Sequence, residues 1–473
     1  MTRRWWIRGV FALTAWGVTS VAFAQTSSSS SQPPTSASDA PQVAVGTPPA
    51  TVPTPTMPVF KPRANGRVSV FTDSWWSTPD EGPGRRFGQI ISSASFHAAE
   101  TDDNGFDYGI DTRFSGLSGA SRPSSFSMYE GYAGVRSGNG TLRIRAGNVW
   151  LNELGALGSL AGGVVEVRQA PDADRHERWR IGVFGGLEPR ILDIGYYAGV
   201  KKFGAYTSLD GDNGRRHTMG YISLRDQSVT ERSVVSVSNF IPAKRVFFLY
   251  QALEYDVAQP AGQAKSGLSY FYSNARYNAS PRVELQGTYN RGRSVDTRGL
   301  ADDVVNGRPI AQTTVDGLAY ESLGGRITIE PVARVRVFTG YSRDTTNRDD
   351  RPSGRVTVGG YAPNVGHSGF DLAASYWRID RTNLGYHSEF VSLGRQVGRR
   401  AYISGDYTTS LSVVRFVRSS DGIVIEDHPR TRRVSGTGSI NVNSTTTLQF
   451  TVDRMWDTGV REFRLLIGAT QRF

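Results

Sequence analysis

Residues 461–473, REFRLLIGATQRF, carry the clearest indication of the fold, because their side chains alternate in character along the chain. The apolar positions share one parity: Phe463, Leu465, Ile467, Ala469 and Phe473. The positions of the other parity are polar, charged or glycine, apart from Leu466. Successive side chains of a β-strand point to opposite faces. The segment therefore predicts a strand with one apolar face and one mostly polar face.

The same alternation recurs from about residue 67 to the C-terminus. It is clearest in residues 106–114, 141–150, 282–291 and 334–342. A period of two dominates, and no long amphipathic helix pattern is present. We predict an all-β antiparallel fold of about 22 strands, with roughly 18 as the lower bound. Residues 191–206 are ambiguous, since they fit a loop, a strand or both.

Alternating strands suit either a soluble β-sandwich or a transmembrane β-barrel, and the connections favour the barrel. A sandwich joins its apolar faces in one core, whereas a membrane barrel turns its apolar face to lipid. Counted back from the last strand, one set of connections is short: residues 443–444, 398–399, 330–331, 279–281, 242–243 and 137–140. The alternate set is longer: residues 295–316, 343–351, 259–265, 151–162 and 77–86. Short periplasmic turns and long extracellular loops are typical of outer-membrane barrels.

Tryptophan positions agree with this alternation. Five tryptophans fall at the strand ends next to the longer connections: Trp75, Trp76, Trp150, Trp377 and Trp456. Trp179 falls at the opposite end. Amphipathic rings prefer a membrane–water interface, so we expect aromatic girdles on the outer surface.

The N-terminal 64 residues have a different composition from the rest. Residues 1–24 combine a basic start, an apolar stretch and the small-x-small triplet Ala22-Phe23-Ala24, which predicts a signal peptide cleaved before Gln25. Residues 25–64 are rich in Pro, Ser and Thr and predict a disordered periplasmic linker. Two roles are open for the linker. It either attaches the barrel to the cell wall or to a periplasmic partner, or it is a spacer that binds no partner. Residues 65–473 form the predicted barrel.

A signal peptide followed by alternating strands and a C-terminal phenylalanine resembles the outer-membrane β-barrel proteins of Gram-negative bacteria, in particular their porin-like class. The resemblance implies export to the cell outer membrane and contact with its lipid bilayer. It also implies that Phe463, Leu465, Ile467 and Phe473 form the signal read by the barrel-assembly machinery. Gln471 departs from the family pattern, in which this position is usually aromatic or aliphatic.

Composition excludes several chemistries. The chain has no cysteine, which rules out disulfides, thiolate metal sites and thiol nucleophiles. The motifs of serine hydrolases, zinc proteases and nucleotide-binding proteins are missing, and the six histidines lack metal-ligand spacing. Asp427-His428, with Asp302-Asp303 and Asp349-Asp350 on other predicted loops, distantly resembles the sites of outer-membrane proteases, but adjacent surface Asp and His are usually solvated loop residues. We expect no enzyme, no cofactor and no metal.

The formal net charge is +11, and it becomes +8 (11 − 3) after the expected removal of Arg3, Arg4 and Arg8. The charge is spread over alternating strand positions, which argues against a nucleic-acid partner. Arginine facing lipid near the midplane is costly, so the strand arginines should face the lumen. The candidate pore-lining residues are Arg113, Arg143, Arg145, Arg180, Arg282, Arg334, Arg336 and Arg464. They either favour anions in a wet pore or brace the wall through ion pairs with acids on the same face.

Residues 151–163, LNELGALGSLAGG, are apolar and glycine-rich apart from Glu153. They predict either a loop folded into the lumen or an extracellular cap. We expect a porin-like channel for small polar or anionic solutes. The alternative is a structural or surface-interaction barrel, or the outer-membrane component of a polymer secretion system.

Overall fold

A computed structural model describes residues 64–98, 105–118, 124–137, 140–151, 154, 158–170, 176–190, 194–211, 213–242, 246–258, 267–381, 384–417 and 423–473. These residues belong to the second of two units of the chain, Lys61–Phe473. The predicted signal peptide, and the predicted linker up to residue 63, lie outside the described residues.

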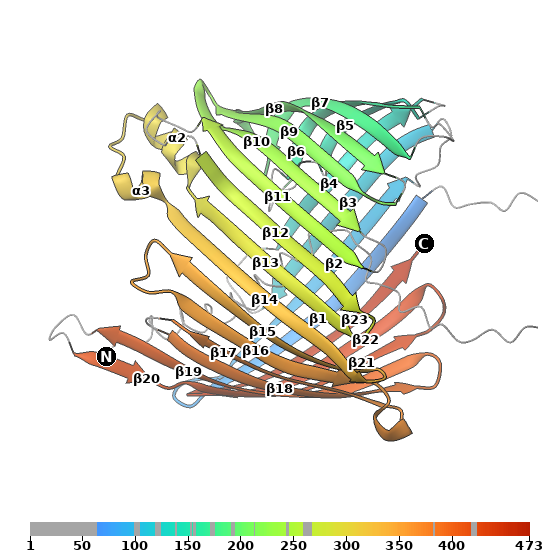
Figure 1. The fold of residues 1–473 in the computed structure, drawn as a ribbon, viewed down its shortest axis with the longest axis vertical. Helices are drawn as coiled ribbons and strands as arrows, with labels where there is room; N and C mark the ends of the chain where they lie inside the picture. Colours follow the sequence, from blue (N-terminus) through green and yellow to red (C-terminus); the bar gives the residue numbers. More distant parts are fainter. Residues whose placement is uncertain are drawn as a thin grey trace, which may run out of the picture. The chain divides into compact units, whose positions relative to one another are not determined.

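The described residues form a closed antiparallel β-barrel of 22 strands with one extra strand (Figure 1). The first wall strands are β1 (Ala64–Pro79), β2 (Arg85–Ala98), β3 (Gly105–Ser118), β4 (Ser125–Arg136), β5 (Leu142–Trp150), β6 (Ser159–Arg168), β7 (Glu177–Pro189), β8 (Tyr196–Gly211), β9 (Arg216–Asp226), β10 (Val229–Pro242) and β11 (Phe247–Ala258). The others are β12 (Gly267–Ser280), β13 (Val283–Ser294), β14 (Leu318–Val332), β15 (Val335–Thr346), β16 (Ser353–Ala362), β17 (Phe370–Asp380), β18 (Leu384–Val397), β19 (Ala401–Val417), β21 (Arg430–Asn441), β22 (Thr446–Asp457) and β23 (Val460–Arg472).

Each wall strand pairs with its neighbours in the sequence, and β1 pairs with both β2 and β23, which closes the sheet. The predicted number of strands is therefore confirmed, and the ambiguous residues 191–206 contain the start of β8. The extra strand, β20 (Val424–Asp427), pairs with the end of β19. The wall strands have 9 to 17 residues, which is long enough to cross a bilayer.

The described residues include three short helices, which lie in connections between strands. They are α2 (Thr297–Val305), α3 (Gln312–Asp316) and η3 (Val365–His367). Within the described part of the chain, no helix has the length and apolarity needed to cross a membrane. Helix α2 packs on β10, where the Arg298 Nε donates to Glu231 at 2.7 Å. Burial lowers the pKa of Arg298, but the hydrogen bond and charge of Glu231 outweigh it and raise the pKa overall.

The two ends of the barrel differ in their connections. We call the end with Ala64 and Phe473 the terminal end, and the opposite end the distal end. Two-residue turns at the terminal end include residues 281–282 and 333–334. The long β13–β14 connection, residues 295–317, lies at the distal end with α2 and α3 (Figure 1). The predicted alternation of shorter and longer connections is confirmed here, but the turns expected at residues 279–281 and 330–331 lie at 281–282 and 333–334.

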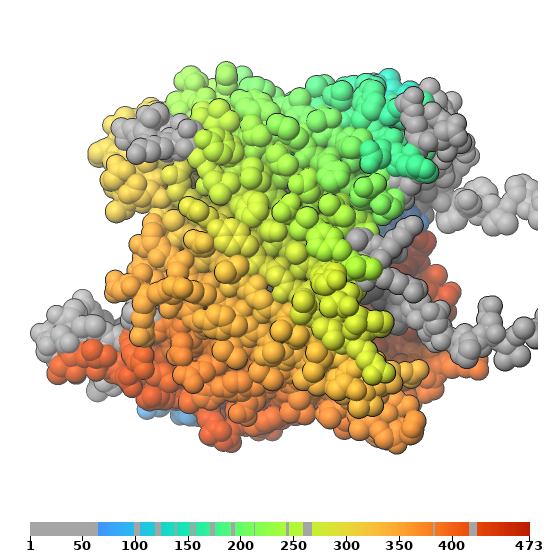
Figure 2. All heavy atoms as spheres, viewed as in Figure 1, coloured from blue at the N-terminus to red at the C-terminus, as the bar shows by residue number. Residues whose placement is uncertain are grey.

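The outer face of the sheet is apolar. In β23, Phe463 and Ile467 are 40% and 51% exposed, whereas Arg464 between them turns inward and bonds Asp73 of β1. The space-filling view shows the outer surface over β9 to β19 as a continuous layer of side chains (Figure 2). A soluble sandwich would bury such an apolar face, so this is a membrane barrel with its apolar face to lipid, as in the outer membrane.

The strand register corrects part of the predicted tryptophan girdle. Trp76, Trp150 and Trp456 lie on outward positions at the distal end, and Trp179 lies outward at the terminal end. Trp75 and Trp377 instead lie on inward positions. The position of a tryptophan along a strand fixes its depth, but the face depends on the register.

Candidate pore and its lining

A small apolar core lies inside the barrel against β5 to β9. Its buried residues are Tyr132, Val149, Leu151, Leu154, Leu160, Val164, Phe184, Tyr206, Ile222 and Leu224. Leu151 and Leu154 belong to the β5–β6 connection, and Leu154 is 1% exposed. A Cβ added at Gly220, on the inward face of β9, would meet the Leu154 Cδ2 at 2.2 Å. Leu151 and Leu154, described residues of the predicted loop 151–163, thus lie inside the lumen, whereas residues 159–163 belong to wall strand β6.

A buried ion-pair network lies next to this core, towards the terminal end. Asp107 of β3 accepts from the Arg143 Nε and, at 2.9 Å, from the Arg136 Nη2. Glu166 of β6 is fully buried and accepts from Arg168, from the Arg180 Nη1 at 3.2 Å and from the Tyr206 hydroxyl. Arg180 also donates to Asp210. A buried carboxylate is stable only when it is paired in this way, so these arginines brace the wall.

Arg145 differs from its neighbour Arg143. It is 6% exposed, its guanidinium lies 5.5 Å from the Tyr132 ring centre, and its Nε and Nη2 have no hydrogen-bond partner among the described residues. The contact with the ring is a cation–π interaction, which offsets part of the cost of burial. Arg145 therefore lies where the ion-pair network meets the apolar core.

Other parts of the inner wall are exposed to solvent. Arg113 of β3 and Arg326 of β14 lie on inward positions near the middle of their strands and are exposed. Neither has an ion-pair partner among the residues that the structure describes. Arg326 lies 3.8 Å from the ring centre of Phe338. Because the sheet is closed, an exposed inward side chain at this height indicates space inside the barrel that water can enter.

Two further candidates lie on inward strand positions with acidic partners. Arg464 donates from its Nε and Nη2 to Asp73 at 2.8 and 2.7 Å, and its guanidinium lies 4.6 Å from the Trp75 ring centre. Arg336 is 67% exposed and lies 3.8 Å from Glu330. These pairs differ greatly in burial, and only the buried one should contribute much to stability.

Arg282 and Arg334 are not strand residues, which corrects the sequence analysis. Arg282 precedes β13, and its carbonyl accepts from the Glu330 backbone N–H at 2.8 Å. Arg334 lies in the two-residue β14–β15 turn with a φ of 70°. Both were predicted to lie on strands, because each falls in the same alternation as the polar residues of the strand that follows it. Each following strand, β13 or β15, begins one residue later than the pattern indicates.

The sequence analysis missed two features of the inner wall. Arg326 follows two glycines, which obscure the alternation. Arg232 was missed because β10 contains a bulge between Thr230 and Arg232 that changes the parity. Arg232 donates to Asp256 at 2.7 Å and to Glu254 at 2.9 Å. The positive charge of Arg232 is thus neutralised by acids on the same face of the sheet, as it is for the other inner-wall arginines that form ion pairs with described residues.

The acidic and histidine residues of the distal loops include His428 and Glu426. His428 lies 3.8 Å from Glu426, and both are exposed. Among the described residues, no group of His, Asp and Glu has the geometry to hold a metal ion.

The residues of the predicted assembly signal lie on β23 and at its end. Phe463, Leu465 and Ile467 occupy outward positions. The Phe473 backbone N–H donates to the Gly66 carbonyl at 2.9 Å, and its ring lies 5.8 Å from that of Phe96. Gln471 instead bonds Thr445 and Thr446 in the neighbouring turn. Recognition of this strand by the assembly machinery stays a prediction.

Comparison with solved structures finds proteins that align over most of this chain, at low sequence identity and with low TM-scores. OccAB4 of Acinetobacter baumannii aligns over 88% of this chain and 100% of that one, with 9% identity and a TM-score of 0.42. OccK7 (OpdD) of Pseudomonas aeruginosa aligns over 87% and 99%, with 9% identity and a TM-score of 0.41. OpdQ of P. aeruginosa aligns over 87% and 99%, with 7% identity and a TM-score of 0.40. These proteins are outer-membrane porins. No protein-family model and no curated protein sequence matches the chain.

Proposed function

We propose that this barrel is a porin-like channel that passes small polar solutes by diffusion. The observation that carries the proposal is the exposure of Arg113 and Arg326 inside a closed sheet, because a sealed lumen would bury them. The loop residues Leu151 and Leu154 fill the side of the lumen next to β5 to β9. Solutes would therefore pass through the part of the lumen that these residues leave free. Diffusion through a pore needs no cofactor and no catalytic residue.

The preference among solutes follows from the charges that remain unpaired. Arg113 and Arg326 lack an ion-pair partner among the described residues, whereas Arg143, Arg180 and Arg464 are held by acids. A fixed positive charge beside a narrow wet path attracts anions and repels cations. The channel should therefore favour small anions modestly over cations of the same size.

The experiment is conductance of the purified protein in a planar bilayer with a salt gradient. We expect steady conductance and a reversal potential on the anion-selective side. The double variant Arg113→Gln with Arg326→Gln should shift the reversal potential towards zero. The matched variant Arg113→Lys with Arg326→Lys keeps both charges and should keep the selectivity. Raising the salt concentration should mute the difference, because screening acts over about 10 Å at 0.1 M.

Two outcomes would contradict the proposal in different ways. The absence of any conductance from correctly folded protein would favour the structural or surface-interaction alternative. An open channel whose reversal potential is the same in all three proteins would leave the pore but remove the role of these two arginines.

A further inference from the structure

The outer surface of the barrel carries its charge almost entirely at one end. At the distal end the register places these cations on outward positions: Arg86, Lys201, Arg225, Arg291, Arg293, Arg343, Arg378, Arg430, Arg432, Arg454 and Arg461. Among the described residues, the outward acids at that end are Glu321, Asp380 and Glu389 on the wall strands, and Glu426 on β20, which is paired with Arg415. Near the terminal end, Arg395 is the outward strand arginine among the described residues. The excess positive charge thus lies on the distal rim.

The cations are densest on five adjacent strands, β21, β22, β23, β1 and β2. We call the residues there the basic rim patch: Arg430, Arg432, Arg454, Trp456, Arg461, Trp76 and Arg86. The pairing makes the patch continuous, because Trp456 lies opposite Arg432 on one side and Arg461 on the other. Trp76 lies opposite Arg86 on the next pair of strands.

The patch alternates cations with aromatic rings. The guanidinium of Arg454 lies 5.2 Å from the Trp456 ring centre, and that of Arg86 lies 5.3 Å from Trp76. Trp76 in turn lies 5.3 Å from Phe463. Tryptophan rings of this kind lie at the membrane–water interface. The arginines of the patch are therefore held at the depth of lipid headgroups.

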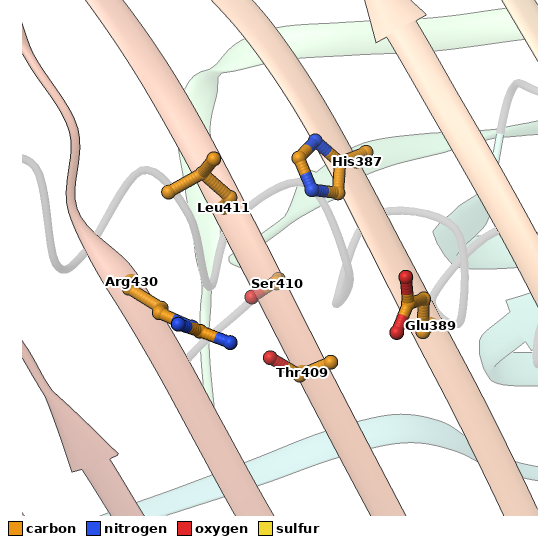
Figure 3. Close-up of a pocket in the computed structure, with 6 residues that line it drawn as sticks. All are labelled: His387, Glu389, Thr409, Ser410, Leu411 and Arg430. Carbon is orange, nitrogen blue, oxygen red and sulfur yellow. The ribbon is translucent and has the colours of Figure 1, made fainter.

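Most of this positive charge is not neutralised by the protein. Arg461 lies 3.9 Å from Asp80. Arg430, Arg432 and Arg454 have no ion-pair partner within the described ranges. Beside Arg430 is a cleft of about 240 Å³, lined across β18, β19 and β21 by His387, Glu389, Thr409, Ser410 and Leu411 (Figure 3). Glu389 is the acid of this cleft, and it lies on β18 with β19 between it and Arg430.

We propose that the basic rim patch binds the phosphate groups of lipids in the leaflet at the distal end. Arginine binds phosphate through two parallel N–H bonds, and several arginines within reach of one headgroup bind it cooperatively. The ligand is a lipid rather than a free anion, because outward positions below the patch are apolar, as at Val434, Val452 and Ile467. Such a surface holds acyl chains while the rim holds the phosphates.

The position of the arginines along the strands agrees with this assignment. An arginine on the lipid face costs much at the midplane and little near the interface. Anionic headgroups at the interface make the same position favourable. If the lipids at the rim had only neutral headgroups, placing the arginines at one end of the barrel would not stabilise the protein in the membrane.

The experiment compares three proteins purified in neutral detergent, with bound lipid counted by native mass spectrometry. They are the unaltered protein, the patch variant Arg432→Gln with Arg454→Gln and Arg461→Gln, and a control variant Arg395→Gln with Arg399→Gln and Arg400→Gln. Both variants lose three positive charges, but the control loses them at the terminal end. The probes are lipid A, its dephosphorylated form and inorganic phosphate. A heat-modifiability gel confirms that each variant is folded, and Arg454→Gln alone serves if the triple variant is not.

We expect the unaltered protein and the control variant to retain lipid A equally, and the patch variant to bind it about a hundredfold more weakly. Dephosphorylated lipid should bind all three proteins equally and weakly. Equal retention of lipid A by the patch variant would overturn the proposal. Binding of the dephosphorylated lipid as tightly as lipid A would show that the apolar surface alone holds lipid. Displacement of lipid A by inorganic phosphate at the same concentration would identify a free-anion site instead.

Discussion

The inner wall contains ion pairs of two kinds, which differ in burial. Glu166 is fully buried and accepts hydrogen bonds from Arg168, Arg180 and Tyr206. Glu330 and Arg336, in contrast, form a solvent-accessible pair at 3.8 Å. Breaking a buried pair leaves an uncompensated charge, and breaking an exposed pair leaves a solvated one. The same residue type at the same strand parity therefore contributes differently to stability.

Arg180→Gln should lower the free energy of unfolding by about 3 kcal/mol, because Glu166 and Asp210 lose a shared cation in a buried site. The loss is at the lower end of the range for buried pairs, since Arg168 and Tyr206 still bond Glu166. Arg336→Gln removes the same charge from an exposed pair and should cost under about 1 kcal/mol. Urea unfolding of protein inserted in lipid vesicles, followed by tryptophan fluorescence, measures both. Equal losses would contradict the distinction.

Residue parity predicted most of the inward arginines but could not predict their partners. Arg143, Arg145 and Arg180 were placed on the inner face, and the structure has them there. Asp107 and Asp210 come from different strands, and their contacts with these arginines depend on the register between strands. Parity also fails at turns and bulges, as at Arg334 and Arg232. Trp75 and Trp76 are adjacent, so they necessarily lie on opposite faces.

At the scale of elements, β23 completes the barrel. It pairs along its length with β22 and β1, and the Phe473 backbone bonds Gly66. Its outward apolar face continues the lipid-facing surface of both neighbours. The strand thus has a structural role, and the resemblance to outer-membrane proteins implies a further role in assembly, which stays a prediction.

Deleting Phe473 should reduce the amount of folded barrel and leave unassembled protein in the periplasm. Phe473→Ala keeps the backbone bonds to Gly66 and removes only the ring, so a similar reduction would support recognition of the ring. Tyr277→Ala removes an outward aromatic ring at the same end of the barrel and should have little effect. Heat-modifiable protein in membrane fractions is the readout. Normal levels for both Phe473 variants would rule out the assembly role.

Alternation predicts strands well because each strand of a membrane barrel lies between lipid and a polar interior. Every strand therefore alternates apolar and polar side chains with a period of two, and the turns lie where this alternation is interrupted. The helices α2 and α3 were not predicted, since helices of 9 and 5 residues are too short to show a helical period clearly. The placement of Leu154 was undecided, because it depends on Gly220, which lies 66 residues away (220 − 154).

At the scale of the whole molecule, the lumen is asymmetric. Leu151 and Leu154 of the β5–β6 connection and the apolar core fill the side next to β4 to β9, whereas the exposed arginines Arg113 and Arg326 lie on β3 and β14. The conducting cross-section is therefore narrower than a barrel of 22 strands would give if its lumen were empty.

Leu154→Asp should widen the path, because a buried carboxylate against Gly220 would release the loop from the wall. We expect single-channel conductance to rise severalfold and larger neutral sugars to enter vesicles that contain the variant. Leu154→Met keeps an apolar side chain of similar volume and should conduct like the unaltered protein. Unchanged conductance and sugar exclusion for Leu154→Asp would mean that the loop does not set the width.

The pairing of β1 with β23 has a consequence for how the chain reaches its native state. Ser69 bonds Thr470 across a separation of 401 residues. The entropic cost of closing such a ring grows only slowly with chain length, so the large separation in sequence adds little to this cost. Both edges of the growing sheet nevertheless stay unpaired until the final strand arrives, and an unpaired edge is a template for aggregation. The interval of greatest vulnerability thus extends over the whole of synthesis and export, and it ends only when the last strand meets the first.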